Sequence, residues 1–65
     1  MEKFYLTFGQ RSEYKDGWFL IIAKDYLAAR ELAHEKFGNN WSMLYFDDEF
    51  EPGFFPNGEI DILRN

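Results

Sequence analysis

Aromatic side chains are the feature that most constrains how this chain can fold. Of its 65 residues, eight are Phe, four are Tyr and two are Trp, while none is Cys. A domain this small buries only about 60% of its unfolded surface, and without cysteine neither a disulfide nor a thiolate-bound zinc ion can reinforce it. Each aromatic side chain can bury ~150–250 Å². We therefore expect one domain over residues 1–65 whose stability depends on aromatic packing, on self-association, or on both.

Two stretches in the first third of the chain predict paired strands. Apolar and other residues alternate over residues 3–8, which is typical of a strand with one buried face. Residues 18–23 are apolar at every position and follow the turn signal Asp16-Gly17, so we expect a central strand there. The two stretches are separated by a polar segment and predict a hairpin with a long loop.

A helix is predicted over residues 26–37. Asp25 is a suitable N-cap, the segment contains no Gly or Pro, and Gly38 is placed to end the helix. Leu27 falls on the polar side. The residues expected to face the sheet are Tyr26, Ala29, Leu32, Ala33 and Phe37.

The remaining segments complete an α+β domain. Residues 41–46 predict a third strand and residues 59–63 a short edge strand, with an acidic and aromatic loop over 46–58 between them. The expected order is β-β-α-β(-β): two layers, with a three- or four-stranded, mostly antiparallel sheet and one helix on one face. The helical connection leaves open whether the second and third strands are parallel.

The negative charge of the chain is concentrated in its last third. Residues 1–46 carry six acids and six bases, whereas residues 47–65 carry six acids and one base, which accounts for the net charge of −5. Asp47, Asp48, Glu49 and Glu51 form the densest part, and we predict that they meet a basic surface on a partner protein. Two other interpretations stay open: a solvated loop that maintains solubility, and a cation-binding loop, which Phe50 and Pro52 interrupt.

Three apolar residues are predicted to anchor the same partner. They are Phe50, Phe54 and, on the polar side of the helix, Leu27, because interfaces combine buried aromatic anchors with a charged rim. The competing interpretation is that the phenylalanines of the loop fold back and close the core. Both interpretations hold together if Phe55 points inward and Phe54 outward.

No group of residues in the sequence indicates catalysis. His34 is the only histidine and has just Glu31 as a neighbour of the right kind on the same helix face. Zinc-protease and phosphate-loop motifs are absent from the sequence. We expect a protein that is not an enzyme and has no metal or cofactor.

Other partners are considered on composition. The acidic balance and the scattered bases argue against direct binding of nucleic acid, although Tyr5 and Trp18 on an open sheet face would suit single strands. The longest apolar run, residues 18–23, is too short to cross a membrane. A homo-oligomer formed through the open sheet face or an edge strand remains an alternative, with an interface rich in Trp18, Tyr45 and Phe54.

A series of landmarks resembles small acidic proteins encoded by phages and prophages, some of them inhibitors of bacterial defence systems of the anti-CRISPR type. The landmarks are Thr7-Phe8-Gly9, Gly17-Trp18, Ala28-Ala29-Arg30, Phe37-Gly38-Asn39-Asn40-Trp41, Tyr45, Phe55-Pro56 and Gly58-Glu59-Ile60. The resemblance covers nearly the whole chain in spacing but contains no catalytic motif. It implies a protein in the cytoplasm of a bacterial host that blocks a host complex, one that handles nucleic acid, by steric and electrostatic means.

Overall fold

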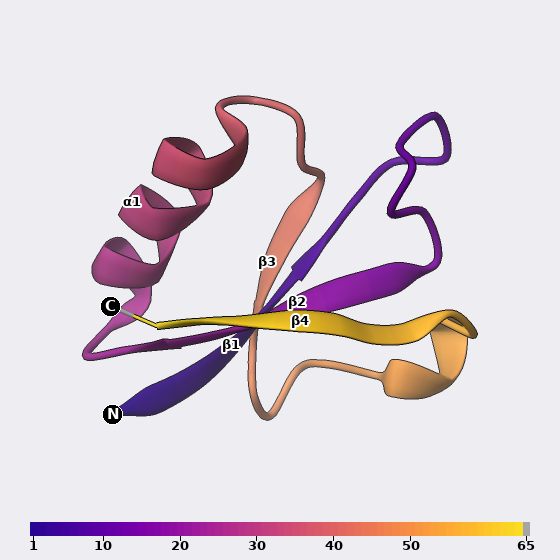
Figure 1. Cartoon of the computed structure of the whole chain (residues 1–65). Helices are drawn as coiled ribbons and strands as arrows, with labels where there is room; N and C mark the ends of the chain where they lie inside the picture. Colours follow the sequence, from indigo (N-terminus) through magenta and orange to yellow (C-terminus); the bar gives the residue numbers. More distant parts are fainter. Residues whose placement is uncertain (65) are drawn as a thin grey trace.

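The computed structural model describes residues 1–64 and shows one helix packed on one face of a four-stranded sheet (Figure 1). The elements, in chain order, are β1 (Glu2–Thr7), β2 (Gly17–Ala23), α1 (Tyr26–Phe37), β3 (Met43–Phe46), the 3₁₀ turn η1 (Pro52–Phe54) and β4 (Gly58–Arg64). This is the α+β architecture that the sequence predicts.

The strand order in the sheet is β3-β1-β2-β4. β1 pairs antiparallel with both β2 and β3, whereas β4 runs parallel to β2. The prediction that β2 is central is confirmed, and so is the edge position of β4. The parallel pair joins β2 to β4, while β2 and β3, which the helix connects, are not neighbours.

The helix begins and ends where its capping residues indicate. The Asp25 carboxylate accepts a hydrogen bond from the Ala28 backbone N–H at 2.9 Å. At the other end Gly38 has a φ of +61° and donates its N–H to the carbonyl of His34. Ala28, Ala29 and Ala33 are buried, and their small side chains let the helix backbone lie close to the sheet.

The core lies between α1 and the sheet. The alternation of β2 places Phe19, Ile21 and Ala23 in this layer, and β1 contributes Phe4 and Leu6. Aromatic rings close its ends: at one end Phe8 and Phe37 pack edge to face with ring centroids 5.1 Å apart. The opposite alternation of β1 and β2 leaves Tyr5, Trp18, Leu20 and Ile22 on the other face of the sheet.

The hairpin loop between β1 and β2 fixes the start of β4. Asn57 donates its side-chain amide to the Lys15 carbonyl at 2.8 Å and its backbone N–H to the Asp16 carbonyl at 2.7 Å. Gly17 then pairs with Gly58, and the absence of a side chain at Gly17 leaves room for Ile60. These contacts place β4 in parallel beside β2.

The third strand is shorter than predicted. It starts at Met43, and Trp41, which the sequence placed in the strand, lies before it. The reason is that the Trp41 indole N–H donates to the Gly38 carbonyl at 3.0 Å and its ring packs edge-on against His34. Within residues 1–64, no helix is long and apolar enough to cross a membrane.

Candidate protein-binding surface

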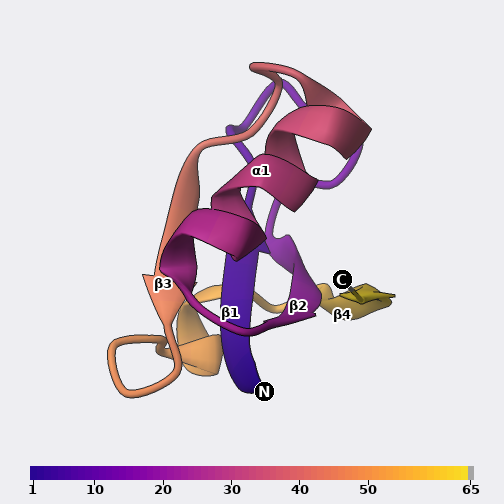
Figure 2. The ribbon, with the colours of Figure 1, turned by 90° about the vertical axis from the view of Figure 1, so that its left-hand side faces the viewer.

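The loop over residues 47–57, here called the acidic loop, crosses the face of the sheet opposite α1. β3 and β4 lie at opposite edges of the sheet, so the chain between them has to pass over one face. Figures 1 and 2 show α1 on one side of the sheet and the loop, in orange, on the other. The loop therefore covers part of the face that carries Tyr5 and Trp18.

Phe50 fastens the acidic loop to the sheet. Its ring stacks on Tyr5 with centroids 4.4 Å apart and an interplanar angle of 5°. It also packs edge-on against Trp18 at 5.0 Å and stacks against Phe55 at 5.2 Å. Only 9% of the Phe50 surface is exposed. Tyr45 packs against the same ring, so the loop rests on a cluster of five aromatic side chains, named here the aromatic cluster.

Asp47 is held by a second contact between the loop and the sheet. The Tyr5 hydroxyl donates a hydrogen bond to the Asp47 carboxylate at 2.7 Å. This bond, burial, and the negative charges of Asp47 and Glu59 raise the pKa of Tyr5 to about 12. The hydroxyl therefore keeps its proton, and with it the hydrogen bond, through the whole physiological pH range.

The four predicted carboxylates lie at the surface. Asp47, Asp48, Glu49 and Glu51 are all exposed. The Glu49 side chain accepts the Phe46 backbone N–H at 3.4 Å, and the Glu49 N–H in turn donates to the Phe46 carbonyl at 3.1 Å. These bonds tighten the turn that follows β3. The carboxylates thus project from a folded turn that is packed on the sheet.

Glu59 belongs with this acidic surface, although sequence reasoning did not select it. It lies on β4 opposite Trp18, and its charge contributes to the raised pKa of Tyr5. Its charge and that of Asp47 act on the same tyrosine only because the acidic loop returns across the sheet to β4. In the sequence, its position in a strand that begins after the Asn57-Gly58 turn is the only available signal.

The three predicted apolar anchors have different surroundings. Phe54 lies in η1 within the acidic loop and is 77% exposed, while Phe55 is half-buried. This agrees with the interpretation in which Phe55 points inward and Phe54 outward. Phe50 is buried in the aromatic cluster, as the competing interpretation of a folded-back loop expects. Leu27 is 62% exposed but lies on α1, on the opposite side of the sheet from the loop. Leu27 stays a predicted partner contact, since the helix start packs on the end of β3, next to the acidic run.

The aromatic residues proposed for self-association or nucleic-acid binding are partly occupied within the chain. Trp18 and Tyr5 contact Phe50, and Tyr45 contacts both Phe50 and Phe55. The Trp18 indole nitrogen is buried and has no hydrogen-bond partner among residues 1–64. The loop thus covers part of each ring, while Tyr5, Trp18 and Tyr45 all keep some exposed surface.

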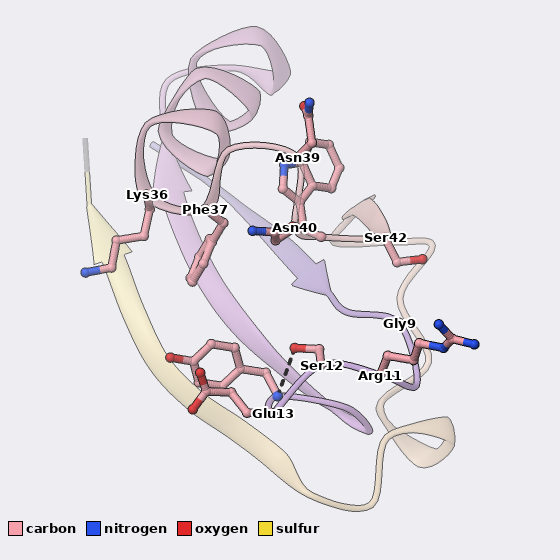
Figure 3. Close-up of a pocket in the computed structure, with 11 residues that line it drawn as sticks. Gly9, Arg11, Ser12, Glu13, Lys36, Phe37, Asn39, Asn40 and Ser42 are labelled. Carbon is pink, nitrogen blue, oxygen red and sulfur yellow. Dashed lines mark hydrogen bonds between the residues drawn. The ribbon is translucent and has the colours of Figure 1, made fainter.

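A cleft lies between the hairpin loop and the segment that follows α1. It has a volume of about 820 Å³ and is open to solvent (Figure 3). Phe37 and Asn40 point toward its centre, whereas Arg11 and Lys36 point away from it. The Ser12 hydroxyl in its wall accepts the Tyr14 backbone N–H at 3.0 Å. Ser12 thus serves a local turn in this wall, and Arg11 and Lys36 do not point toward a shared centre.

The described part of the chain also contains no candidate metal centre. Nowhere in residues 1–64 do three His, Cys, Asp or Glu side chains gather closely enough to hold a metal ion. The carboxylates of the acidic loop thus spread over a surface and do not converge on one point. Such spacing suits contact with several positive charges on a partner.

Comparison with known proteins gives no relative from which to transfer a role. No protein-family model, no curated protein and no solved structure matches the chain.

Proposed function

We propose that this chain is a non-enzymatic binding protein that covers a basic surface of a partner protein with its acidic loop. The observation that carries the proposal is the burial of Phe50 beneath the loop. Because Phe50 fastens the loop to the sheet, the four carboxylates keep their positions before any partner arrives. Binding by an ordered loop loses less conformational entropy than binding by a mobile one.

The composition of the surface supports a protein partner. Phe54 is exposed within the same loop, and its backbone N–H donates to the carbonyl of the acidic residue Glu51 at 3.1 Å. Protein interfaces commonly combine an aromatic anchor with a charged rim. The contacts proposed here are Phe54, Asp47, Asp48, Glu49, Glu51 and Glu59.

The narrower form of the proposal concerns the identity of the partner. A basic groove that holds nucleic acid carries closely spaced positive charges, and a row of carboxylates is complementary to such a groove. Together with the resemblance to phage-encoded inhibitors, this favours a bacterial host complex that binds nucleic acid, such as a defence complex. The protein would act there by occupying the groove.

Affinity capture with a charge-matched control tests the proposal. The test variant replaces Asp47, Asp48, Glu49 and Glu51 with Asn or Gln, which keeps oxygen acceptors for the Tyr5 hydroxyl and the Phe46 amide. The control variant replaces four exposed acids elsewhere with Gln. These are Glu2, Glu13, Glu31 and Glu35. Both variants have the same net charge, so a difference between them reports the position of the charges.

We expect the wild type and the control to retain the same protein from a bacterial lysate and the test variant to lose it. For the purified partner, the test variant should bind about tenfold more weakly or worse, since several charge pairs are lost together. Equal retention by both variants would contradict the role of the acidic loop. A partner that does not bind nucleic acid would remove only the narrower form.

A further inference from the structure

The outer edge of β4 is open to a further strand. β4 is the last strand of the sheet and pairs with β2 along one side only, from Gly58 to Arg64. Figure 2 shows no described segment beyond β4 at this edge. Ile60 and Ile62 are 37% and 40% exposed, and β4 contains no proline or lysine. Lysine and proline commonly protect strand edges from pairing, and so do other charged residues, of which β4 carries Glu59, Asp61 and Arg64.

One backbone amide of this open edge is satisfied within the free protein. The Ile62 N–H donates to the carboxylate of the preceding residue, Asp61, at 2.8 Å. A side chain can reach this amide only from outside the sheet, so the Ile62 N–H points away from β2. Because the backbone groups of a strand alternate in direction, the amide of Arg64 faces the same way. Asp61 therefore covers the middle of the free edge.

A small cleft between α1 and β4 lies next to this edge. It has a volume of about 160 Å³, and its walls are formed by Leu32, Glu35, Lys36, Leu63 and Arg64. Leu63 faces the helix side, because it pairs with the buried Ile21, and Asp61 faces the same side, because it pairs with Phe19. A strand added to β4 would thus place alternate side chains beside Asp61 and beside Leu63.

We propose that the outer edge of β4 accepts an extended segment of a partner protein, with a basic residue beside Asp61 and an aliphatic residue two positions away in the Leu32–Leu63 cleft. The carbonyl of the added strand takes over the Ile62 N–H, and the cation of its Lys or Arg pairs with the displaced Asp61 carboxylate. Edge addition of this kind draws its affinity from backbone hydrogen bonds and its specificity from side-chain pockets.

Charge complementarity favours this partner over a second copy of the chain. If two β4 strands paired antiparallel about Ile62, each Asp61 would lie opposite Leu63 of the other copy. Neither carboxylate would then gain a cation when it released the Ile62 N–H. Each copy also carries a net charge of −5, which opposes close approach. Asp61 therefore discriminates against self-pairing and in favour of a basic strand.

This site differs from the acidic loop and does not depend on the proposed function. The test is a titration of the ¹⁵N-labelled full chain with the capped peptide Thr-Thr-Lys-Thr-Val-Thr-Thr. The peptide concentration is raised into the millimolar range, and binding is measured from the amide chemical shifts. We expect shifts at Ile62, Arg64 and Leu32, and smaller ones in the acidic loop. The matched peptide with Glu in place of Lys should bind about two- to fivefold more weakly, the range of one exposed ion pair.

Charge reversal of Asp61 provides the decisive comparison. In the Asp61→Lys variant the preference should invert, so that the Glu peptide binds more tightly than the Lys peptide. The proposal is overturned if the β4 amides do not respond, or if the preference stays the same in the variant. It is also overturned if the wild type alone shows concentration-dependent broadening at Ile62, because a second copy would then occupy the edge.

Discussion

Tyr5 joins three parts of the molecule through one side chain. Its ring supports Phe50, its hydroxyl donates to Asp47, and its backbone lies in β1 between β2 and β3. The raised pKa of Tyr5 reflects the contact with Asp47, because the Asp47 carboxylate stabilises the protonated hydroxyl. The contact links residues 42 positions apart in the chain.

The raised pKa predicts how stability depends on alkaline pH. The pKa of Tyr5 is about 12 in the folded protein, against 10.0 for an unperturbed tyrosine. The folded state therefore holds this proton more tightly than the unfolded state. The stabilisation is complete below pH 10 and is lost as the pH rises from 10 toward 12. Urea denaturation across this range should show a decreasing free energy of unfolding.

The Tyr5→Phe variant isolates the contribution of the hydroxyl. It keeps the ring that stacks on Phe50, so we expect a loss of about 0.5–1.5 kcal/mol at neutral pH and a weaker decline above pH 10. An unchanged decline in the variant would show that another group controls the alkaline transition. Absorbance titration of tyrosinate in the two proteins identifies the group that ionises late.

At the scale of elements, the acidic loop is held like a regular part of the fold. It has one short 3₁₀ turn and no strand, yet its Phe50 is as well buried as residues of the core between sheet and helix. The aromatic cluster thus acts as a second, smaller core on the face opposite α1. This arrangement covers part of a sheet face that a single helix leaves uncovered.

Phe50 and Phe54 form a matched pair for testing the second core. Phe50→Ala should destabilise the protein by about 3 kcal/mol or more, as expected for a buried Phe. Phe54→Ala should change stability by less than about 0.5 kcal/mol, because Phe54 is 77% exposed. Chemical denaturation of both variants measures the difference. Similar losses in the two would contradict the fastening role of Phe50.

At the scale of the whole molecule, the concentrated negative charge lowers the stability of the folded state. Four carboxylates occupy five consecutive positions in the acidic loop, and the chain carries a net charge of −5. Like charges at this spacing repel one another, which lowers the stability of a compact state. A domain of this size has only about 3–10 kcal/mol of stability in total. A binding role gives a physical reason for keeping so much charge on a folded loop.

The variant with four neutralised loop acids should therefore be as stable as the wild type or more stable, by up to about 1 kcal/mol. The gain should shrink as salt is added, because salt screens exposed charges. Thermal or urea unfolding at low and high ionic strength checks both statements. A clear loss of stability would show that the carboxylates hold the loop in place, and it would require a folding control in the binding test.

The local elements were readable from the sequence because their causes are local. Asp25 and Gly38 bound the helix through caps within a few residues, and alternation in 3–8 marks the face of β1 that becomes buried. The continuous apolar run of β2 indicates a strand covered on both faces, and α1 on one face and Phe50 of the acidic loop on the other provide that cover. The short start of β3 was missed because the Trp41 side chain bonds back to the helix end.

The sequence by itself determined the class of fold and the acidic character of the last third, and it offered the outward position of Phe54 as one of two interpretations. Tertiary structure alone decided that β4 runs parallel to β2, that Phe50 is buried and Leu27 lies on the other side of the sheet, and that Glu59 and Asp47 act on the same tyrosine. The physical reason is the distance along the chain over which each kind of interaction acts. Caps, turns and alternation act over a few residues, whereas these contacts join segments that only the crossing of the acidic loop brings together.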